Sequence, residues 1–102
     1  MKKVFISQSM RDKTPEEIEA VRESAIQTIE ELIGEKIEVI DSYFKEDYAK
    51  TNNPLLCLGK SIQLLSEVDI AYFVKGWDNA RGCKIEYLCA VEYGIDVIIE
   101  EE

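Results

Sequence analysis

The feature that most constrains the fold is the alternation of four short apolar segments with longer segments of helical periodicity. Short apolar runs between turn residues are typical of strands that are buried on both faces. Helices that connect successive strands require parallel pairing and right-handed crossovers. The sequence therefore predicts an α/β fold, a three-layer flavodoxin-like (Rossmann-like) parallel sheet of four strands in the order 2-1-3-4. The predicted strands are residues 3–7, 37–40, 68–74 and 95–99.

Capping signals mark where the predicted helices begin and end. Thr14 and Glu17 form a capping box around Pro15, and Gly34 closes the helix that follows. Pro54, directly after an asparagine, begins the second long helix. The remaining predicted elements are a helix over 83–93 and loops over 41–52 and 76–82.

The chain length fits one domain, since 102 residues support a single hydrophobic core. We expect this domain to span residues 1–102. No apolar run approaches the roughly 20 residues that span a bilayer, so no membrane partner is expected. The apolar start of the chain is too short for a signal peptide and ends at Gln8, which favours a cytoplasmic protein.

The charge and the residue types present exclude several classes of function. A net charge of −9 argues against binding to nucleic acid or to anionic membranes, which begins with a basic surface. The chain has no histidine, so Ser-His and Cys-His nucleophiles and histidine-based metal sites are excluded. The three cysteines show no Cys-x-x-Cys spacing and fit small core residues in a reducing compartment. We expect neither a metal nor a cofactor, and we expect the acidic tail, residues 100–102, to be a solvated end.

Ligands of open parallel sheets bind beyond the carboxyl ends of the strands, where the strand order reverses. The segments at that edge are residues 7–13, 41–52 and 75–82 and the start of the third helix. Basic residues in loops and exposed N–H groups at helix starts favour an anionic ligand such as a nucleotide phosphate. Lysines that serve only solubility are the alternative. Seven of the twelve basic residues lie in or beside these segments: Arg11, Lys13, Lys45, Lys50, Lys75, Arg81 and Lys84.

Glu86 is the carboxylate with the most unusual surroundings. Its helical neighbours three and four positions away are Gly82, Cys83, Cys89 and Ala90, and none of them is charged. A carboxylate on such a face, one turn from the helix start, is partly desolvated and has a raised pKa unless a ligand or the helix terminus compensates. The alternative is an ordinary exposed glutamate.

Polar and aromatic residues near the same edge are candidates for ligand contacts. The hydroxyl and amide groups of Ser7, Gln8 and Ser9 follow the first strand and could bind phosphate or sugar oxygens, or could be turn residues. Trp77 could stack on a base, or could pack against the edge of the core.

Two segments together resemble a known family. They are Lys3-Val4-Phe5-Ile6-Ser7-Gln8-Ser9-Met10-Arg11 and Gly76-Trp77-Asp78-Asn79-Ala80-Arg81-Gly82-Cys83-Lys84-Ile85-Glu86. They look like an uncharacterised domain family common in phage and bacterial genomes. That family is similar in turn to the nucleoside 2-deoxyribosyltransferases and the 2′-deoxynucleoside 5′-monophosphate N-glycosidases. The resemblance implies a single nucleoside deoxyribosyltransferase-like domain.

In those enzymes a glutamate four residues after a glycine attacks the anomeric carbon of deoxyribose, which matches Gly82 and Glu86. A carboxylate nucleophile suits cleavage through an oxocarbenium-like state and needs no histidine. The chain departs from the enzymes at Phe5, where they have a tyrosine that orients the glutamate, and at Ala80, near which they have a serine or aspartate. The resemblance and the position of the loops give a catalytic pair, Glu86 and Asp78, and a ligand-binding set of Ser7, Gln8, Ser9, Arg11, Asp41, Gly76, Trp77, Asn79, Arg81 and Gly82.

Three functions are consistent with these features. The first is an N-glycosidase or 2-deoxyribosyltransferase whose partner is a small-molecule nucleoside or nucleotide. The second is a catalytically inactive nucleotide-binding module that acts as a sensor, a sponge or an accessory subunit. An interaction protein without a small ligand is a third. The resemblance also implies a homodimer or a higher homo-oligomer.

Overall fold

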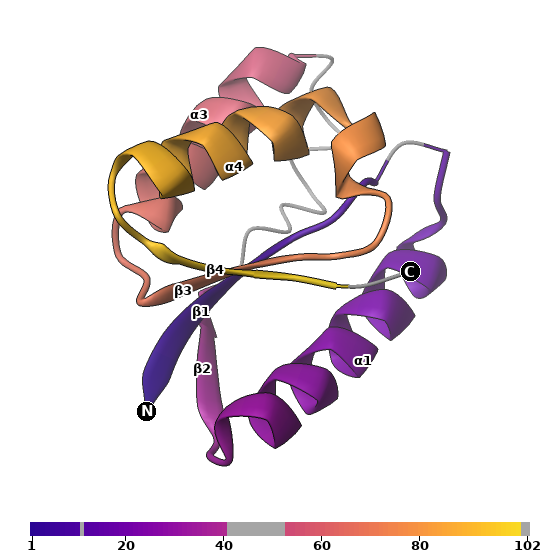
Figure 1. Ribbon diagram of the computed structural model, residues 1–102. Helices are drawn as coiled ribbons and strands as arrows, with labels where there is room; N and C mark the ends of the chain where they lie inside the picture. The colour runs from indigo at the N-terminus through magenta and orange to yellow at the C-terminus, as the bar shows by residue number, and fades with distance from the viewer. Residues whose placement is uncertain (11, 41–52, 101–102) are drawn as a thin grey trace.

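A four-stranded parallel sheet with the order β2-β1-β3-β4 forms the centre of the computed structural model, which describes residues 1–10, 12–40 and 53–100. Helix α1 covers one face of the sheet, and α3 and α4 cover the other (Figure 1). The predicted three-layer α/β fold and its strand order are therefore confirmed. The predicted loop over 41–52 lies outside the described residues. The bounds are β1 Lys2–Ser7, α1 Pro15–Ile33, β2 Ile37–Ile40, α3 Pro54–Leu65, β3 Ile70–Phe73, α4 Arg81–Glu92 and β4 Asp96–Ile99.

The helix caps form as the sequence predicts. The Thr14 hydroxyl accepts a hydrogen bond from the Glu17 amide at 3.1 Å, and the Glu17 carboxylate accepts one from the Thr14 amide at 3.3 Å. Gly34 adopts the left-handed conformation, φ 74°, that ends α1. The Asn53 side chain caps α3 by accepting a hydrogen bond from the Leu56 amide at 3.1 Å.

The segment between β3 and α4 is more regular than predicted. A short 3-10 helix, η1 (Trp77–Asn79), lies inside the predicted loop, and α4 begins at Arg81, two positions earlier than expected. Gly76 makes the turn into η1 at φ 93°, a conformation that glycine adopts without strain. The compact connection places the first turn of α4 directly after the carboxyl end of β3.

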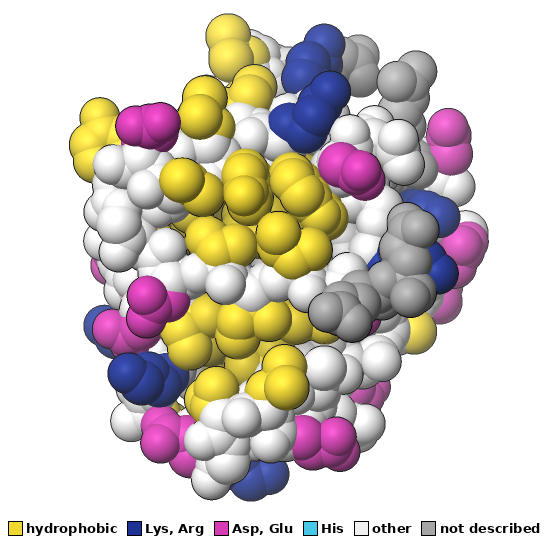
Figure 2. All heavy atoms as spheres, viewed as in Figure 1, with side chains coloured by type: hydrophobic (Ala, Val, Ile, Leu, Met, Phe, Trp, Pro, Cys, Tyr) yellow, Lys and Arg dark blue, Asp and Glu magenta, His cyan; other side chains and the backbone are white. Residues whose placement is uncertain are grey.

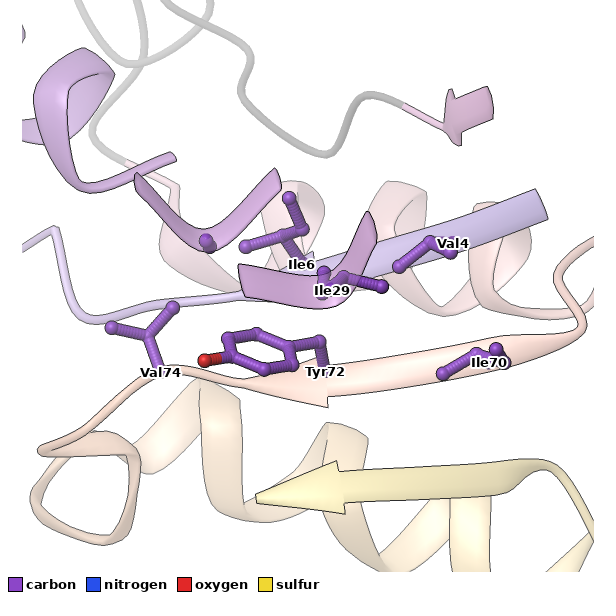
Figure 3. Close-up of a cluster of buried hydrophobic side chains, with 7 residues drawn as sticks. Val4, Ile6, Ile29, Ile70, Tyr72 and Val74 are labelled. Atoms are coloured by element: carbon purple, nitrogen blue, oxygen red, sulfur yellow. The ribbon is translucent and has the colours of Figure 1, made fainter. Parts of the chain in front are cut away.

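Two hydrophobic cores lie on the two faces of the sheet. Val4, Ile6 and Tyr72 face α1, where they pack against Ile29 and neighbouring buried side chains (Figure 3). Phe5 faces the other way and packs with residues of β3, α3 and α4. Because side chains alternate along a strand, Ser7 lies on the same face as Phe5, toward α3 and α4.

Glu100 corrects the expectation that residues 100–102 form a solvated tail. Its carboxylate accepts hydrogen bonds from the Tyr72 hydroxyl at 3.1 Å and from the Lys75 amide at 2.7 Å. Burial, followed by the charge of Glu100 and the hydrogen bond to it, raises the pKa of Tyr72 to about 12. Glu100 therefore joins the end of β4 to the end of β3, and the two residues after it lie outside the described part of the chain.

Tyr72→Phe is expected to lower the free energy of unfolding by about 1 kcal/mol, because it removes this hydrogen bond without opening a cavity. Urea denaturation monitored by circular dichroism measures the change. Tyr93→Phe is the matched control, since Tyr93 is 84% exposed and its hydroxyl loss is expected to have little effect. Equal stabilities of the Tyr72 and Tyr93 variants would contradict a stabilising role for the Tyr72–Glu100 bond.

Candidate active site around Glu86

Four buried polar side chains from three elements meet on the face of the sheet that carries α3 and α4. Ser7 is the last residue of β1, Ser61 lies in the middle of α3, and Cys83 and Glu86 lie on α4. The Ser7 hydroxyl donates a hydrogen bond to Glu86 Oε1 at 2.7 Å. The exposed fractions are 2% for Ser7, 5% for Ser61, 5% for Cys83 and 8% for Glu86, so each is almost fully removed from solvent.

The environment of Glu86 opposes its ionisation. Burial raises its pKa from 4.5 to about 7, although hydrogen bonds from Ser7 and Ser61 favour the carboxylate and act in the opposite direction. Glu86 is therefore roughly half ionised at neutral pH. The buried position and raised pKa agree with the prediction from its uncharged helical neighbours, and they exclude an ordinary exposed glutamate.

The Cys83 thiol is not a nucleophile in this cluster. Burial, opposed by a hydrogen bond with Ser7 and reinforced by the nearby Glu86 carboxylate, raises the pKa of Cys83 to about 11. A thiol with this pKa stays protonated at neutral pH, and the thiol form is a poor nucleophile. Glu86 is the group of the cluster that changes its charge near pH 7.

Trp77 packs against the edge of the core. Its ring stacks on Tyr87 with a centroid separation of 4.6 Å and an interplanar angle of 28°. Phe73 contacts both rings edge-on, at centroid distances of 5.5 and 5.4 Å. One face of the indole is therefore occupied by Tyr87, and a base that stacks on Trp77 has only the other face available.

Gln8 lies on the opposite side of the sheet from Glu86. Its amide nitrogen donates to the Ile18 carbonyl at 3.3 Å, and its amide oxygen accepts from Arg22 Nη1 at 3.1 Å. These bonds attach the end of β1 to α1. The structure therefore gives Gln8 a structural contact with α1, whereas Ser7 beside it contacts Glu86.

The other predicted ligand residues lie around the start of α4. Gly76, Trp77 and Gly82 are half-buried, and Asp78, Asn79 and Arg81 are exposed; Ser9, after β1, is half-buried. Arg11 and Asp41 lie outside the described residues. Ala80, the residue before α4, offers no side chain to cap the helix, in contrast to Thr14 and Asn53 at α1 and α3. The first N–H groups of α4 are thus without a side-chain cap.

Ser61 is the member of the cluster that was not predicted from the sequence. The signal was a polar residue between Cys57 and Leu65 at four-residue spacing, on the side of the helix that is otherwise apolar and buried. A serine at such a position must find a partner inside the protein. Its partner, Glu86, comes from another helix, which the periodicity of α3 cannot indicate.

No other described feature competes with the Glu86 cluster as a reaction centre. A hollow open to solvent lies at the opposite end of the sheet, before β2, and its lining includes Glu30, Glu31 and Glu35. None of the predicted site residues contributes to it. Within residues 1–10, 12–40 and 53–100, no three acidic or thiol side chains are grouped as a metal site would require. None of the described helices has the length and apolar character needed to cross a membrane.

Exposed hydrophobic side chains lie on the outer surface of α3 and α4. Figure 2 shows hydrophobic side chains gathered over α4 and along the edge of the sheet formed by β4. The exposed large hydrophobic side chains on α3 and α4 are Leu55, Leu56, Ile85, Leu88 and Val91.

No family model matches the chain, and no curated protein matches its sequence. The likeness of residues 3–11 and 76–86 to the deoxyribosyltransferase-like families therefore stays a prediction from sequence, and the fold and the Glu86 cluster stand on the structure.

Proposed function

We propose that the protein cleaves or transfers the N-glycosidic bond of a 2′-deoxynucleoside or its 5′-monophosphate, with Glu86 as the nucleophile. The observation that carries the proposal is the Glu86 carboxylate itself. It is 8% exposed, is held by Ser7 at 2.7 Å, and lies one turn into α4, near the carboxyl end of the sheet. The location is where parallel sheets bind their ligands.

The chemistry is a double displacement. A carboxylate oxygen of Glu86 forms a bond to C1′ of the deoxyribose while the bond from C1′ to the base nitrogen breaks. The bonding pair leaves with the base, which takes a proton from a general acid, for which Asp78 on η1 is the candidate. Water then hydrolyses the ester, giving the free sugar and the carboxylate again, or a second base attacks C1′ and completes a transfer.

The raised pKa of Glu86 suits this role. A carboxylate with a pKa of about 7 is more basic than an exposed one, and a substantial fraction of the molecules remains ionised at neutral pH. The hydroxyls of Ser7 and Ser61 orient it without the strong charge neutralisation of a lysine or arginine partner. The group is thus both nucleophilic and held in place.

The edge of the sheet beside the start of α4 has features that suit a phosphate. The uncapped N–H groups at the start of α4 favour a negative charge. Lys13, Lys75, Arg81 and Lys84 are exposed residues of the segments at this edge. These groups favour a 5′-monophosphate over an uncharged nucleoside.

A nucleotide-binding module without turnover is the second candidate function. The apolar surroundings of Phe5 favour it. Phe5 is fully buried in the apolar cluster with Leu65, Ala71, Phe73 and Ala90, so it brings no polar group to the site. Ala80 likewise has no polar side chain at the start of α4. A protein with these residues could keep the nucleotide-binding edge while lacking part of the catalytic apparatus.

Incubation of the protein with each 2′-deoxynucleoside and each 2′-deoxynucleoside 5′-monophosphate, followed by chromatography for free base, tests the proposal. We expect base release from at least one deoxynucleotide, and the corresponding ribonucleotides serve as controls for the sugar. A nucleotide that raises Tm without being cleaved would favour the binding module instead. Neither cleavage nor a rise in Tm would contradict both functions.

A further inference from the structure

The Glu86 carboxylate is held by hydroxyl groups that come from two other elements. Ser7 lies at the end of β1 and is separated from Glu86 by 79 positions in the sequence. Ser61 lies on α3 and also donates to the carboxylate. A side chain bound from both a strand and a second helix cannot rotate without breaking contacts, and orientation of this kind increases the rate of a displacement reaction.

The backbone around Ser7 fixes the position of its hydroxyl. Ser7 pairs with Phe73 in the β1–β3 ladder, and its carbonyl accepts a hydrogen bond from the Val74 amide at 2.9 Å. The side chain is 2% exposed, so water does not compete for the hydroxyl. The contact between Ser7 and Glu86 is therefore fixed by the backbone of the sheet and does not depend on a mobile surface side chain.

The neighbouring thiol carries no competing charge. Burial raises the pKa of Cys83 to about 11, so the thiol stays protonated at neutral pH. The Ser7 hydroxyl has a single hydrogen, and this hydrogen is donated to Glu86 Oε1 at 2.7 Å. Glu86 is therefore the charged acceptor beside Ser7.

Ser61 supplies the second hydroxyl. It is 5% exposed and lies on α3, which packs against α4. Its hydrogen bond to Glu86 favours the ionised form of the carboxylate. Both hydroxyls thus act against the burial that disfavours the negative charge.

We infer that Ser7 and Ser61 are positioning residues for Glu86, which hold its carboxylate in one orientation. The inference rests on the proposed function, because the orientation matters for catalysis only if Glu86 attacks the substrate. It adds two residues whose effect on the reaction is exerted through Glu86.

The test uses Ser7→Ala and Ser61→Ala, with Ser7→Thr and Ser61→Thr as conservative variants that keep a hydroxyl. Ser66→Ala is the matched control, since Ser66 is exposed at the end of α3 and its hydroxyl donates to the Gln63 carbonyl at 2.6 Å. Two quantities are measured for each protein. They are the pKa of Glu86, from the carboxyl ¹³C shift in NMR, and the pH dependence of kcat for base release.

Each alanine variant is expected to raise the pKa of Glu86 by about one unit, because a donor to the carboxylate is lost. The acidic limb of the kcat profile moves to higher pH by the same amount, and kcat at pH 7 falls about tenfold. The threonine variants recover most of both quantities, and Ser66→Ala changes neither.

An unchanged pKa of Glu86 in both alanine variants would overturn the inference, as would threonine variants that recover neither quantity. The NMR titration does not depend on turnover. Absence of base release by the wild-type protein would therefore disprove the proposed function separately, while the titration still decides whether the two hydroxyls hold Glu86. If an alanine variant fails to fold, the threonine variant of the same residue decides, with a pKa and kcat close to those of wild type expected.

Discussion

Glu86→Gln is expected to lower the rate of base release by roughly 10³-fold or more, as removal of an attacking group commonly does. Glutamine has nearly the same shape and can still accept a hydrogen bond from Ser7, but its amide oxygen is a poor nucleophile. The Glu86 side chain is buried, so its replacement changes the rate through the reaction and not through a contact on the protein surface. Initial rates of base release with a saturating deoxynucleotide measure the change.

Glu92→Gln is the matched control for this experiment. Glu92 is the last residue of the same helix and is exposed. Its replacement likewise converts one carboxyl group of α4 to an amide and is expected to leave the rate unchanged. Equal rates for the Glu86 and Glu92 variants would show that Glu86 does not take part in the reaction.

The second large effect concerns stability and pH. The pKa of Glu86 is about 7 in the folded protein, whereas its ordinary value is 4.5. Between pH 4.5 and pH 7, Glu86 therefore keeps a proton in the folded chain that it has lost in the unfolded chain. The contribution of Glu86 to stability is fully present below pH 4.5 and is lost as the pH rises through 7. The loss amounts to about 3 kcal/mol, since one pKa unit corresponds to about 1.4 kcal/mol.

A comparison of the wild-type protein with Glu86→Gln isolates this contribution. The glutamine is neutral at every pH, whereas the other carboxylates titrate equally in both proteins. From pH 4.5 to pH 8 the free energy of unfolding of the variant, relative to wild type, is expected to rise by about 3 kcal/mol. Urea denaturation at a series of pH values measures the difference. A difference that does not change with pH would contradict the burial of an ionisable Glu86.

Local patterns were sufficient to predict the fold. The capping box at Thr14, the proline after Asn53 and the four apolar runs depend on residues close together in the sequence. The alternation of strands and helices then allows few arrangements, and the structure has the predicted one. The predicted bounds failed between β3 and α4, because nothing local distinguishes the 3-10 turn at Trp77 from an irregular loop.

The Glu86 cluster was only partly predictable. The uncharged neighbours of Glu86 on its own helix indicated burial, and the structure agrees. The bond to Ser7 joins residues 79 positions apart, and Ser61 comes from a different helix, so neither contact leaves a periodic signal. Gln8 was predicted together with Ser7, although alternation along β1 places the two side chains on opposite faces.

Glu100 shows the same limitation at the end of the chain. Its position beside Glu101 and Glu102 indicated a solvated acidic tail. Its carboxylate instead binds the Tyr72 hydroxyl and the Lys75 amide, groups that the parallel pairing of β3 and β4 brings beside it. The sequence of the tail alone contains no information about these partners.

Mass spectrometry of the protein quenched during turnover tests whether Glu86 is the nucleophile, because a nucleophilic Glu86 must carry the deoxyribosyl group between the two displacements. We expect a peptide that contains Glu86 and is heavier by one deoxyribosyl or deoxyribosyl phosphate group. The added mass should be absent from Glu86→Gln and present in Glu92→Gln. Base release with no sugar attached to Glu86 at any time of quenching, or with the sugar attached to another residue, would contradict a nucleophilic role for Glu86.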